Sequence, residues 1–418
     1  MHPAFGSSGG LETLKPTLLV ATTANWFPTA RLAMAMANAG FRVEAVCPAG
    51  HPVSRTEAAQ RIHRYHHLRP VASFDGAIAA AKPDIVIPGD DLAARHLHQL
   101  YQSKLDHGKA ETEVCKLIER SLGAAENFPA LFTRAAFLQI AREQGVRGPR
   151  TEVIRSSDDL KQWAAEAGFP VVLKSDGTSG GDGVKIVHGR EEAERAFRAL
   201  AAPPLLARAL KRTFLDGDSA LLWPSLLRRC SVVNAQEFVP GSEATSAIAC
   251  WRGELLASLH FEVIRKAAST GHATVLRIIE SEEMSIAAER MTRRLRLSGL
   301  HGLDYMREAE TGKAHLIEIN PRSTQVGHLA LGPGHDLPAA LYAAVSGEAV
   351  QPAPKVTGHD TIALFPQEWI RDAASPFLRS AYHDVPWEAP ELVRSCVLSR
   401  RKQSGWYSGK TEPTKPPG

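Results

Sequence analysis

The sequence predicts a protein of mixed architecture, α/β in its N-terminal part and α+β in the rest. An apolar strand at 18–21, a helix at about 28–39 and a second strand at 42–46 follow one another, an order typical of a parallel sheet. Further along, apolar runs lie in pairs around turn residues, which predicts antiparallel hairpins. The first unit is therefore Rossmann-like, although it lacks the G-x-G-x-x-G fingerprint.

Changes in composition predict the domain limits. The first residues are rich in glycine and serine and are expected to form a disordered tail. A second change near residue 125 precedes a helical segment between 128 and 148, which Gly145 and Pro149 close. The expected parts are a tail at 1–14, a Rossmann-like domain at 15–125, a second domain at 126–345 and a small extension at 346–418.

Composition narrows the class of protein. The 418 residues carry a net charge of +4, and no run of Lys and Arg has interleaved aromatic residues, so neither nucleic acid nor a membrane is an expected partner. The five cysteines are scattered without a C-x-x-C pair, which argues against a disulfide framework or a zinc site. No signal segment is recognisable, so a cytoplasmic location is expected.

A glycine-rich loop is the first candidate ligand site. A buried strand at 170–173 ends on Lys174, whose charge requires an anionic partner if it is buried. Residues 175–183 hold four glycines, whose backbone N–H groups can face phosphate oxygens. A strand at 184–187 follows instead of a helix, which excludes the Walker A and dinucleotide loops and predicts a flap between two strands. The alternative is a floppy hairpin with an edge-strand lysine.

The second cluster is a turn-rich stretch around Pro240 and Gly241. The strand at 232–239 meets this turn, and the chain returns through 245–250 and 255–261, so we expect an antiparallel meander. A helix at about 283–297 follows. Its apolar stripe consists of Met284, Ala288, Met291 and Leu295.

The third cluster combines acidic and amide side chains on a hairpin. If its turn is centred on Thr311, Asp304 lies opposite Glu318. The two-residue period of a strand places Asn320 and Arg322 on the same face as Glu318. Carboxylate and amide oxygens with room for water and phosphate suit Mg²⁺. The alternative is a structural ion pair between Glu318 and Arg322.

A loop in the N-terminal part ends on two aspartates. The strand at 84–87 runs into Asp90 and Asp91, where a parallel sheet can hold a ligand. The alternative is that one of them caps the helix that follows. Together with residues 323–335, this loop is expected to shape an acceptor pocket.

In this order, the three clusters resemble those of the ATP-grasp ligases, of the carboxylate-amine type with a single grasp domain. The chain has the lysine and glycine flap, then E-F-V-P-G-x-E at 237–243, then an aspartate hairpin with E-I-N-P-R at 318–322. The resemblance covers roughly residues 15–345, and the hairpin is its most specific part. It implies an ATP-grasp fold of two subdomains over 126–345, with ATP bound between them.

The resemblance also implies roles for individual residues. Lys174 would contact the α- and β-phosphates, and the flap would close over them. The flap residues with this expected role are Ser175, Gly180, Gly181 and Gly183. A second cation, a lysine in many members, corresponds here to Arg134, which can contact phosphate with different geometry.

The remaining roles concern the adenosine, the metal and the transferring group. The Glu237 carbonyl and the Val239 N–H, on either side of Phe238, would bind the adenine, and Glu243 would bind the ribose. Mg²⁺, or Mn²⁺ in its place, would be held by Asp304, Glu318 and Asn320. Arg322 would face the transferring phosphoryl group or the acyl phosphate.

The sequence does not assign a role to two further regions. Arg265 and Lys266 are either phosphate contacts or surface cations. The stretch at 356–392 lies beyond the shared core, and its Trp369 and Trp387 are expected to pack.

The expected activity is an ADP-forming ligase that joins a small-molecule carboxylate to an amine or similar nucleophile. One alternative is an ATP-binding grasp protein with a regulatory role, which would be expected to have lost a metal ligand. Another is a dinucleotide-dependent oxidoreductase, against which the missing glycine fingerprint argues. The substrates and the oligomeric state stay open, and a homo-oligomer is compatible with the sequence.

Overall fold

The computed structural model describes residues 15–108, 112–176, 183–203, 225, 230–268 and 271–407, without the side chains of 399–407. The expected tail at 1–14 lies outside the described residues, as do Gly180 and Gly181 of the flap.

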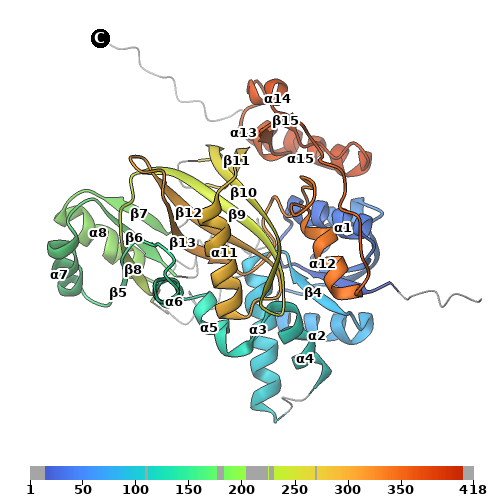
Figure 1. The fold of residues 1–418 in the computed structure, drawn as a ribbon, viewed down its shortest axis with the longest axis horizontal. Helices are drawn as coiled ribbons and strands as arrows, with labels where there is room; N and C mark the ends of the chain where they lie inside the picture. Colours follow the sequence, from blue (N-terminus) through green and yellow to red (C-terminus); the bar gives the residue numbers. More distant parts are fainter. Residues whose placement is uncertain are drawn as a thin grey trace, which may run out of the picture.

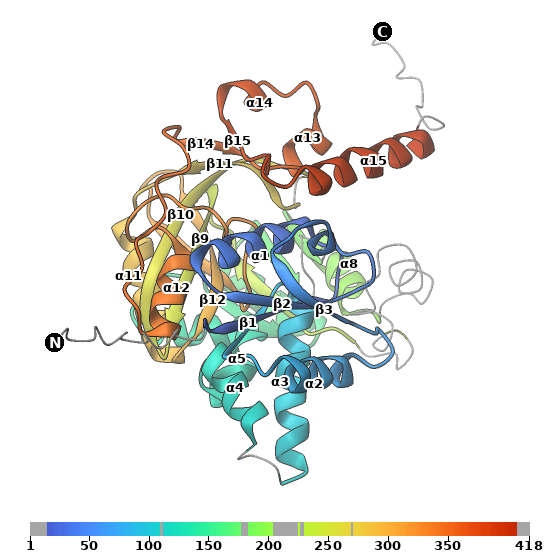
Figure 2. The same ribbon diagram turned by 90° about the vertical axis from the view of Figure 1, so that its right-hand side faces the viewer.

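The N-terminal part is a parallel four-stranded sheet with strand order β3-β2-β1-β4. Its central strands are buried almost throughout because helices cover the sheet (Figure 2), which confirms the Rossmann-like prediction. The strands are β1 (Thr17–Ala21), β2 (Arg42–Cys47), β3 (Ala59–Arg64) and β4 (Ile85–Pro88). The helices are α1 (Phe27–Ala39), α2 (Pro70–Ala81), α3 (Asp91–Asp106) and α4 (Glu113–Leu122).

The helical segment expected between 128 and 148 is two helices, α5 (Phe128–Leu131) and α6 (Arg134–Glu143). The break leaves Thr133 in an extended conformation and puts Arg134 in the first turn of α6. Leu138 and Ala141 on α6 are buried in the core that this part shares with the N-terminal sheet. The break between the two helices therefore sets the position of Arg134 at the start of α6.

A small antiparallel sheet forms a lobe of its own, drawn in green on the left of Figure 1. Its strand order is β5-β8-β6-β7, and the predicted flap strands β6 and β7 pair as a hairpin. A separate core, including Trp163 and Phe197, lies between this sheet and its two helices. The elements are β5 (Thr151–Ile154), α7 (Ser157–Ala167), β6 (Val171–Ser175), β7 (Val184–Val187), α8 (Arg190–Ala201) and β8 (Val233–Glu237).

The other sheet is seven-stranded, with the order β13-β12-β9-β10-β11-β14-β15. The predicted stripe on α11, from Met284 to Leu295, is fully buried. The meander prediction is wrong in one respect: β8 belongs to the small sheet, because residues 238–240 carry the chain from one sheet to the other. The elements are β9 (Gly241–Trp251), β10 (Glu254–Lys266), β11 (Ala273–Ile278), α11 (Glu282–Leu295), β12 (Gly299–Glu308) and β13 (Ala314–Asn320).

The C-terminal stretch adds to the large sheet. Strand β14 pairs antiparallel with β11 and parallel with β15, at the edge of the sheet. Trp369 packs on Phe365, whereas Trp387 is 75% exposed, so the packing prediction is wrong for Trp387. The elements are α12 (Leu337–Ser346), β14 (Thr361–Ala363), α13 (Gln367–Arg371), α14 (Phe377–Ser380), β15 (Tyr382–His383) and α15 (Pro390–Tyr407).

The core joins the N-terminal sheet to the large sheet. One apolar cluster contains Leu18 and Ile85 from the parallel sheet together with Phe261 and Leu300 from the large one. The small sheet, with its own core, is linked to them by α6 and the connection at 238–240. The ligand-binding side chains predicted from the sequence lie where these parts meet. No helix in the described part of the chain is long and apolar enough to cross a membrane.

Candidate active site

The acidic hairpin formed by β12 and β13 carries the predicted metal ligands. Asp304 pairs directly with Glu318, and Asn320 pairs with Gly302. The Thr245 hydroxyl donates to Asp304 Oδ1 at 2.7 Å, and Asn320 Nδ2 donates to Asp304 Oδ2 at 2.9 Å. The three predicted oxygen-bearing side chains are therefore brought together on two adjacent strands.

Burial and like charge set the electrostatics of this hairpin. Burial, and then the neighbouring Glu318, raise the pKa of Asp304 above its ordinary value. Burial also acts to raise the pKa of Glu318, but Arg134 and Lys174 outweigh it and lower that pKa. The hairpin thus holds one carboxylate balanced by cations and one that lacks sufficient positive charge.

Lys174 lies at the end of β6 and is only 6% exposed. Among the described residues its ammonium forms no hydrogen bond or ion pair. Burial lowers its pKa, while Glu318, Asp304 and Glu243 act in the opposite direction. Lys174 is therefore within electrostatic reach of the acidic hairpin, as the sequence predicted, and its charge is not neutralised by direct contact.

Arg134 connects the base of the flap to the hairpin. Its Nη1 atom donates to the Ser175 carbonyl at 2.8 Å and to Asp176 Oδ1 at 3.3 Å. Its Nε and Nη2 atoms both donate to Glu318 Oε2, at 3.2 and 3.1 Å. Arg134, which was expected to contact phosphate, thus donates to Glu318 Oε2, an oxygen that was expected to bind the metal.

Arg322 reaches from the loop after β13 to the N-terminal sheet. Its Nε atom donates to Asp91 Oδ1 at 3.0 Å, and Nη2 donates to Asn320 Oδ1 at 3.2 Å. Its Cζ atom lies 5.3 Å from the centre of the Trp26 ring. The predicted alternative of a structural pair between Arg322 and Glu318 is not found, because Arg322 pairs with Asp91.

The sequence left open whether the two aspartates of the N-terminal loop cap a helix or line the site, and the structure shows one of each. Asp90 caps α3 by accepting from the Ala93 N–H at 2.8 Å, and it also accepts from the hydroxyls of Thr22 and Thr23. Asp91, one residue later, faces the site and binds Arg322. Asp90 is therefore structural, and Asp91 belongs to the site.

The predicted adenosine-binding residues lie along the connection between the two sheets. Glu237 ends β8 and its side chain accepts from the Arg150 N–H at 2.9 Å, while Phe238 is half-buried and Val239 buried. Glu243 accepts from Lys266 Nζ at 2.6 Å. Arg265 lies over the Phe377 ring, with its Cζ atom 5.7 Å from the ring centre.

Two residues of this region were not predicted from the sequence. Asp176, beside the flap, accepts from both Arg134 and Asn234. Arg95 on α3 lies within electrostatic reach of Asp91, Asp176 and Arg134. The sequence could have indicated Arg95, because Arg95 follows Asp91 by four residues and therefore lies on the same face of the helix.

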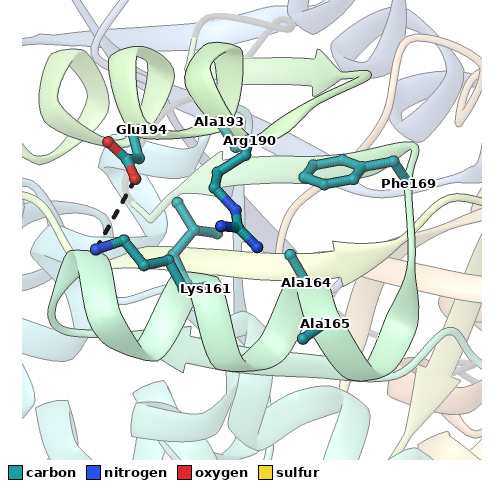
Figure 3. A pocket seen from close by; sticks show the side chains of 8 residues that line it. Lys161, Ala164, Ala165, Phe169, Arg190, Ala193 and Glu194 are labelled. Atoms are coloured by element: carbon teal, nitrogen blue, oxygen red, sulfur yellow. Dashed lines mark ion pairs between the residues drawn. The ribbon is translucent and has the colours of Figure 1, made fainter.

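A pocket that is open to solvent lies away from this region, between α7 and α8 (Figure 3). Phe169, Lys161 and Arg190 are among its lining residues. Phe169 precedes β6, whereas Lys174 is at the other end of that strand. This pocket therefore has no part in the candidate site.

The chain is similar in sequence to known proteins. Residues 133–331 match the family model of the carbamoyl-phosphate synthase L chain, ATP binding domain. The carbamoyl phosphate synthase large chain of Thermus thermophilus is 24% identical over 303 residues, which are 71% of this chain and 27% of that one. The formate-dependent phosphoribosylglycinamide formyltransferase of Bacteroides thetaiotaomicron is 24% identical over 66% of this chain and 59% of its own length. The chain thus spans only part of the length of these relatives.

Solved structures give the same fold. The biotin carboxylase domain of the Hydrogenobacter thermophilus 2-oxoglutarate carboxylase aligns with a TM-score of 0.56 at 13% identity, over 81% of this chain and 71% of that one. The N5-carboxyaminoimidazole synthetase of Staphylococcus aureus, solved with ADP, aligns with a TM-score of 0.54 at 13% identity, over 82% and 80%. The fold is that of an ATP-grasp protein. The sequence match over residues 133–331 covers the small sheet and strands β9 to β13 of the large one.

Proposed function

We propose that the protein is an ADP-forming ligase that uses ATP and Mg²⁺ to join a small-molecule carboxylate to an amine or similar nucleophile. One observation carries the proposal. The carboxylates of β12 and β13, the buried Lys174 of β6 and the Arg134 of α6 come from separate parts of the chain and interact at one place. Such a concentration of opposite charges suits phosphoryl transfer, which depends on positioning and charge neutralisation.

The donor set of the hairpin fits a hard divalent cation. Asp304 and Glu318 offer carboxylate oxygens and Asn320 offers an amide oxygen. Burial and the neighbouring Glu318 raise the pKa of Asp304, and a bound cation would offset both effects. In the described part of the chain no group of three His, Cys, Asp or Glu could hold a metal. Water and phosphate oxygens would therefore complete the coordination of Mg²⁺ or Mn²⁺, which would neutralise charge on the phosphates.

The reaction has two steps. An oxygen of the substrate carboxylate attacks the γ-phosphorus of ATP, and the bond to the β-phosphate oxygen breaks, which gives an acyl phosphate and ADP. The nucleophile then attacks the acyl carbon and gives up a proton, and the carbon–oxygen bond breaks to release phosphate. In this scheme Lys174 neutralises the triphosphate, and Arg322, held by Asp91 and Asn320, stabilises charge on the acyl phosphate.

Binding of ATP would involve both lobes. Ser175 and the flap, including Gly180, Gly181 and Gly183, would cover the phosphates. Arg134 would contact phosphate after releasing Glu318. The backbone of Glu237 to Val239 would bind the adenine, and Glu243 the ribose, with Lys266 as its partner.

Other support comes from the neighbours with known structures. The carboxylase domain was solved with MgADP, ADP and bicarbonate as a dimer, and the synthetase with ADP. These ligands support ATP and Mg²⁺ for this chain, and the dimer makes a homo-oligomer a reasonable expectation. The scattered cysteines agree with a reducing, cytoplasmic location.

A substrate screen tests the proposal. The protein is incubated with ATP, Mg²⁺ and panels of amino acids, short peptides and hydroxy acids, and ADP and inorganic phosphate are measured. Release of both that depends on a carboxylate and a nucleophile supports a ligase. ATP binding without phosphate release in any combination would instead support a regulatory grasp protein.

A further inference from the structure

One cation beside the proposed active site has no role in the mechanism above. Arg95 lies on α3, one helical turn after Asp91, and its Cζ atom is 4.4 Å from the centre of the Phe132 ring. Phe132 follows α5 and leads into α6, which carries Arg134. Arg95 therefore approaches the site from the N-terminal sheet. Its side chain is partly exposed, so a small ligand can reach it.

In the described part of the chain, the guanidinium of Arg95 forms no hydrogen bond and no ion pair; its direct contact is the Phe132 ring. The acids that influence it most are already bonded elsewhere: Asp91 to Arg322, and Asp176 to both Arg134 and Asn234. A guanidinium carries several N–H donors, and leaving them unused in a half-buried position is unfavourable. The donors of Arg95 are available to a ligand.

The surroundings of Arg95 favour an anionic ligand. Burial lowers its pKa, Asp91 and Asp176 partly offset this, and Arg134 lowers it further. Two arginines within electrostatic reach of each other repel, and an anion between or beside them removes that repulsion. The Arg95 guanidinium lies over the Phe132 ring, a contact that uses none of its N–H donors in a hydrogen bond. Those donors suit paired hydrogen bonds to a carboxylate or a phosphate.

We propose that Arg95 binds an anionic group, a carboxylate or a phosphate, that one substrate carries in addition to its reacting group. This inference rests on the proposed function, because it describes the substrate of the same site. Arg95 lies on α3 of the N-terminal part, whereas Lys174, which is assigned to the nucleotide, lies on β6 of the small sheet. Arg95 is therefore a substrate-binding residue and sets specificity for an anionic substrate.

Binding measurements with defined probes test the inference. The full-length protein is loaded with Mg²⁺ and a non-hydrolysable ATP analogue, and succinate or inorganic phosphate is titrated by calorimetry. Wild type is compared with Arg95→Gln and Arg95→Lys. Lys104→Gln is the matched control, because Lys104 is a cation at the far end of the same helix, paired with Asp75.

We expect Arg95→Gln to weaken binding of one probe by about ten- to a hundredfold, the loss of a charge-assisted hydrogen bond. Arg95→Lys should recover part of the affinity, and Lys104→Gln should match wild type. The affinity for the ATP analogue should stay within about twofold in every variant, since Arg95 is assigned no nucleotide contact. The probe that is lost identifies the anion as a carboxylate or a phosphate.

Three results would overturn the inference: neither probe binds wild type, Arg95→Gln binds both probes unchanged, or Arg95→Gln loses the nucleotide instead. The proposed ligase activity is judged separately by the screen for ADP release. Anion binding that depends on Arg95 without any turnover would refute the ligase and keep the anion site. If Arg95→Gln turns over every substrate at the wild-type rate, the ligase is supported and the anion site at Arg95 is refuted.

Discussion

Two carboxylates, Glu368 in the C-terminal stretch and Asp304 at the hairpin of β12 and β13, have different partners. In the C-terminal stretch, the fully buried Glu368 accepts from Thr274 at 2.7 Å and from Arg371 Nε at 2.7 Å, and also from Ser375. Burial alone raises its pKa, but Arg371, Ser375 and Thr274 outweigh it and bring the pKa to about 2. At the hairpin, burial and Glu318 raise the pKa of Asp304.

The difference distinguishes a structural carboxylate, Glu368, from Asp304, which we propose binds a cation. Glu368 has its own arginine three residues away on the same short helix and needs no ligand. Among the described residues, Asp304 receives hydrogen bonds only from the neutral side chains of Thr245 and Asn320, and the neighbouring Glu318 repels it. A divalent cation would supply at the hairpin what Arg371 supplies to Glu368.

The largest effect is expected for turnover. Glu318→Ala or Lys174→Ala should raise the reaction barrier by about 2.7 to 4 kcal/mol, the scale of losing one preorganised electrostatic group. The rate of ADP release with a substrate found by the screen measures this. Lys185→Ala, an exposed lysine on the strand paired with β6, is the control and should keep wild-type activity. ADP release at the wild-type rate by either site variant would contradict the assigned roles.

The next effect concerns stability. Glu368→Gln should lower the free energy of unfolding by about 3 kcal/mol, because the change leaves Arg371 without its partner. Urea unfolding followed by circular dichroism measures it. Glu391→Gln, in an exposed pair with Arg394, should change stability by less than about 0.5 kcal/mol. Equal effects of the two substitutions would show that the buried pair of Glu368 and Arg371 stabilises the fold no more than an exposed pair.

The same carboxylate predicts a pH dependence. The pKa of Glu368 is lowered from 4.5 to about 2 on folding, so its contribution to stability is present above pH 4.5 and is lost as the pH falls towards 2. The difference in unfolding free energy between wild type and Glu368→Gln should therefore shrink at low pH. Unfolding curves at neutral pH and near pH 3 test this. A difference that stays constant over that range would show that charge plays no part.

The smallest effect is expected for Asp304→Asn without metal. Because the substitution removes repulsion from Glu318 and keeps an oxygen for Thr245, stability should change by less than about 1 kcal/mol. Binding of Mn²⁺ with an ATP analogue, measured by electron paramagnetic resonance, should be lost in the same variant. A loss of stability as large as that of Glu368→Gln would assign Asp304 a structural role.

Some features of the site could be predicted from the sequence because they depend on local rules. The polar spacing of β13 placed Glu318 beside Asn320, and the hairpin turn placed Asp304 opposite Glu318. The structure adds a reason that the sequence did not provide: the pairing shifts by one residue between Tyr305 and Asp304. This bulge at Ile317 is what aligns the two acids.

Other features depend on contacts between distant segments, which strand and helix periods do not report. The pairing of Arg322 with Asp91 joins the loop after β13 to the start of α3, and Arg134 at the start of α6 reaches Glu318 on β13. The sequence also did not predict that the chain passes from the small sheet to the large one at 238–240, because this too depends on distant contacts. A turn at Pro240 and Gly241 is compatible with either a hairpin or a crossing, and only the packing of each sheet decides between them.

The short strand β14 has a practical consequence for anyone who shortens this protein. Its three residues cover the side of β11 that would otherwise present free backbone groups to solvent. Removing everything after residue 345, where the sequence suggested a natural limit, would leave β11 as an open edge able to pair with another molecule. Such a truncated chain should self-associate into β-rich aggregates, whereas one that ends after α15 keeps this edge protected.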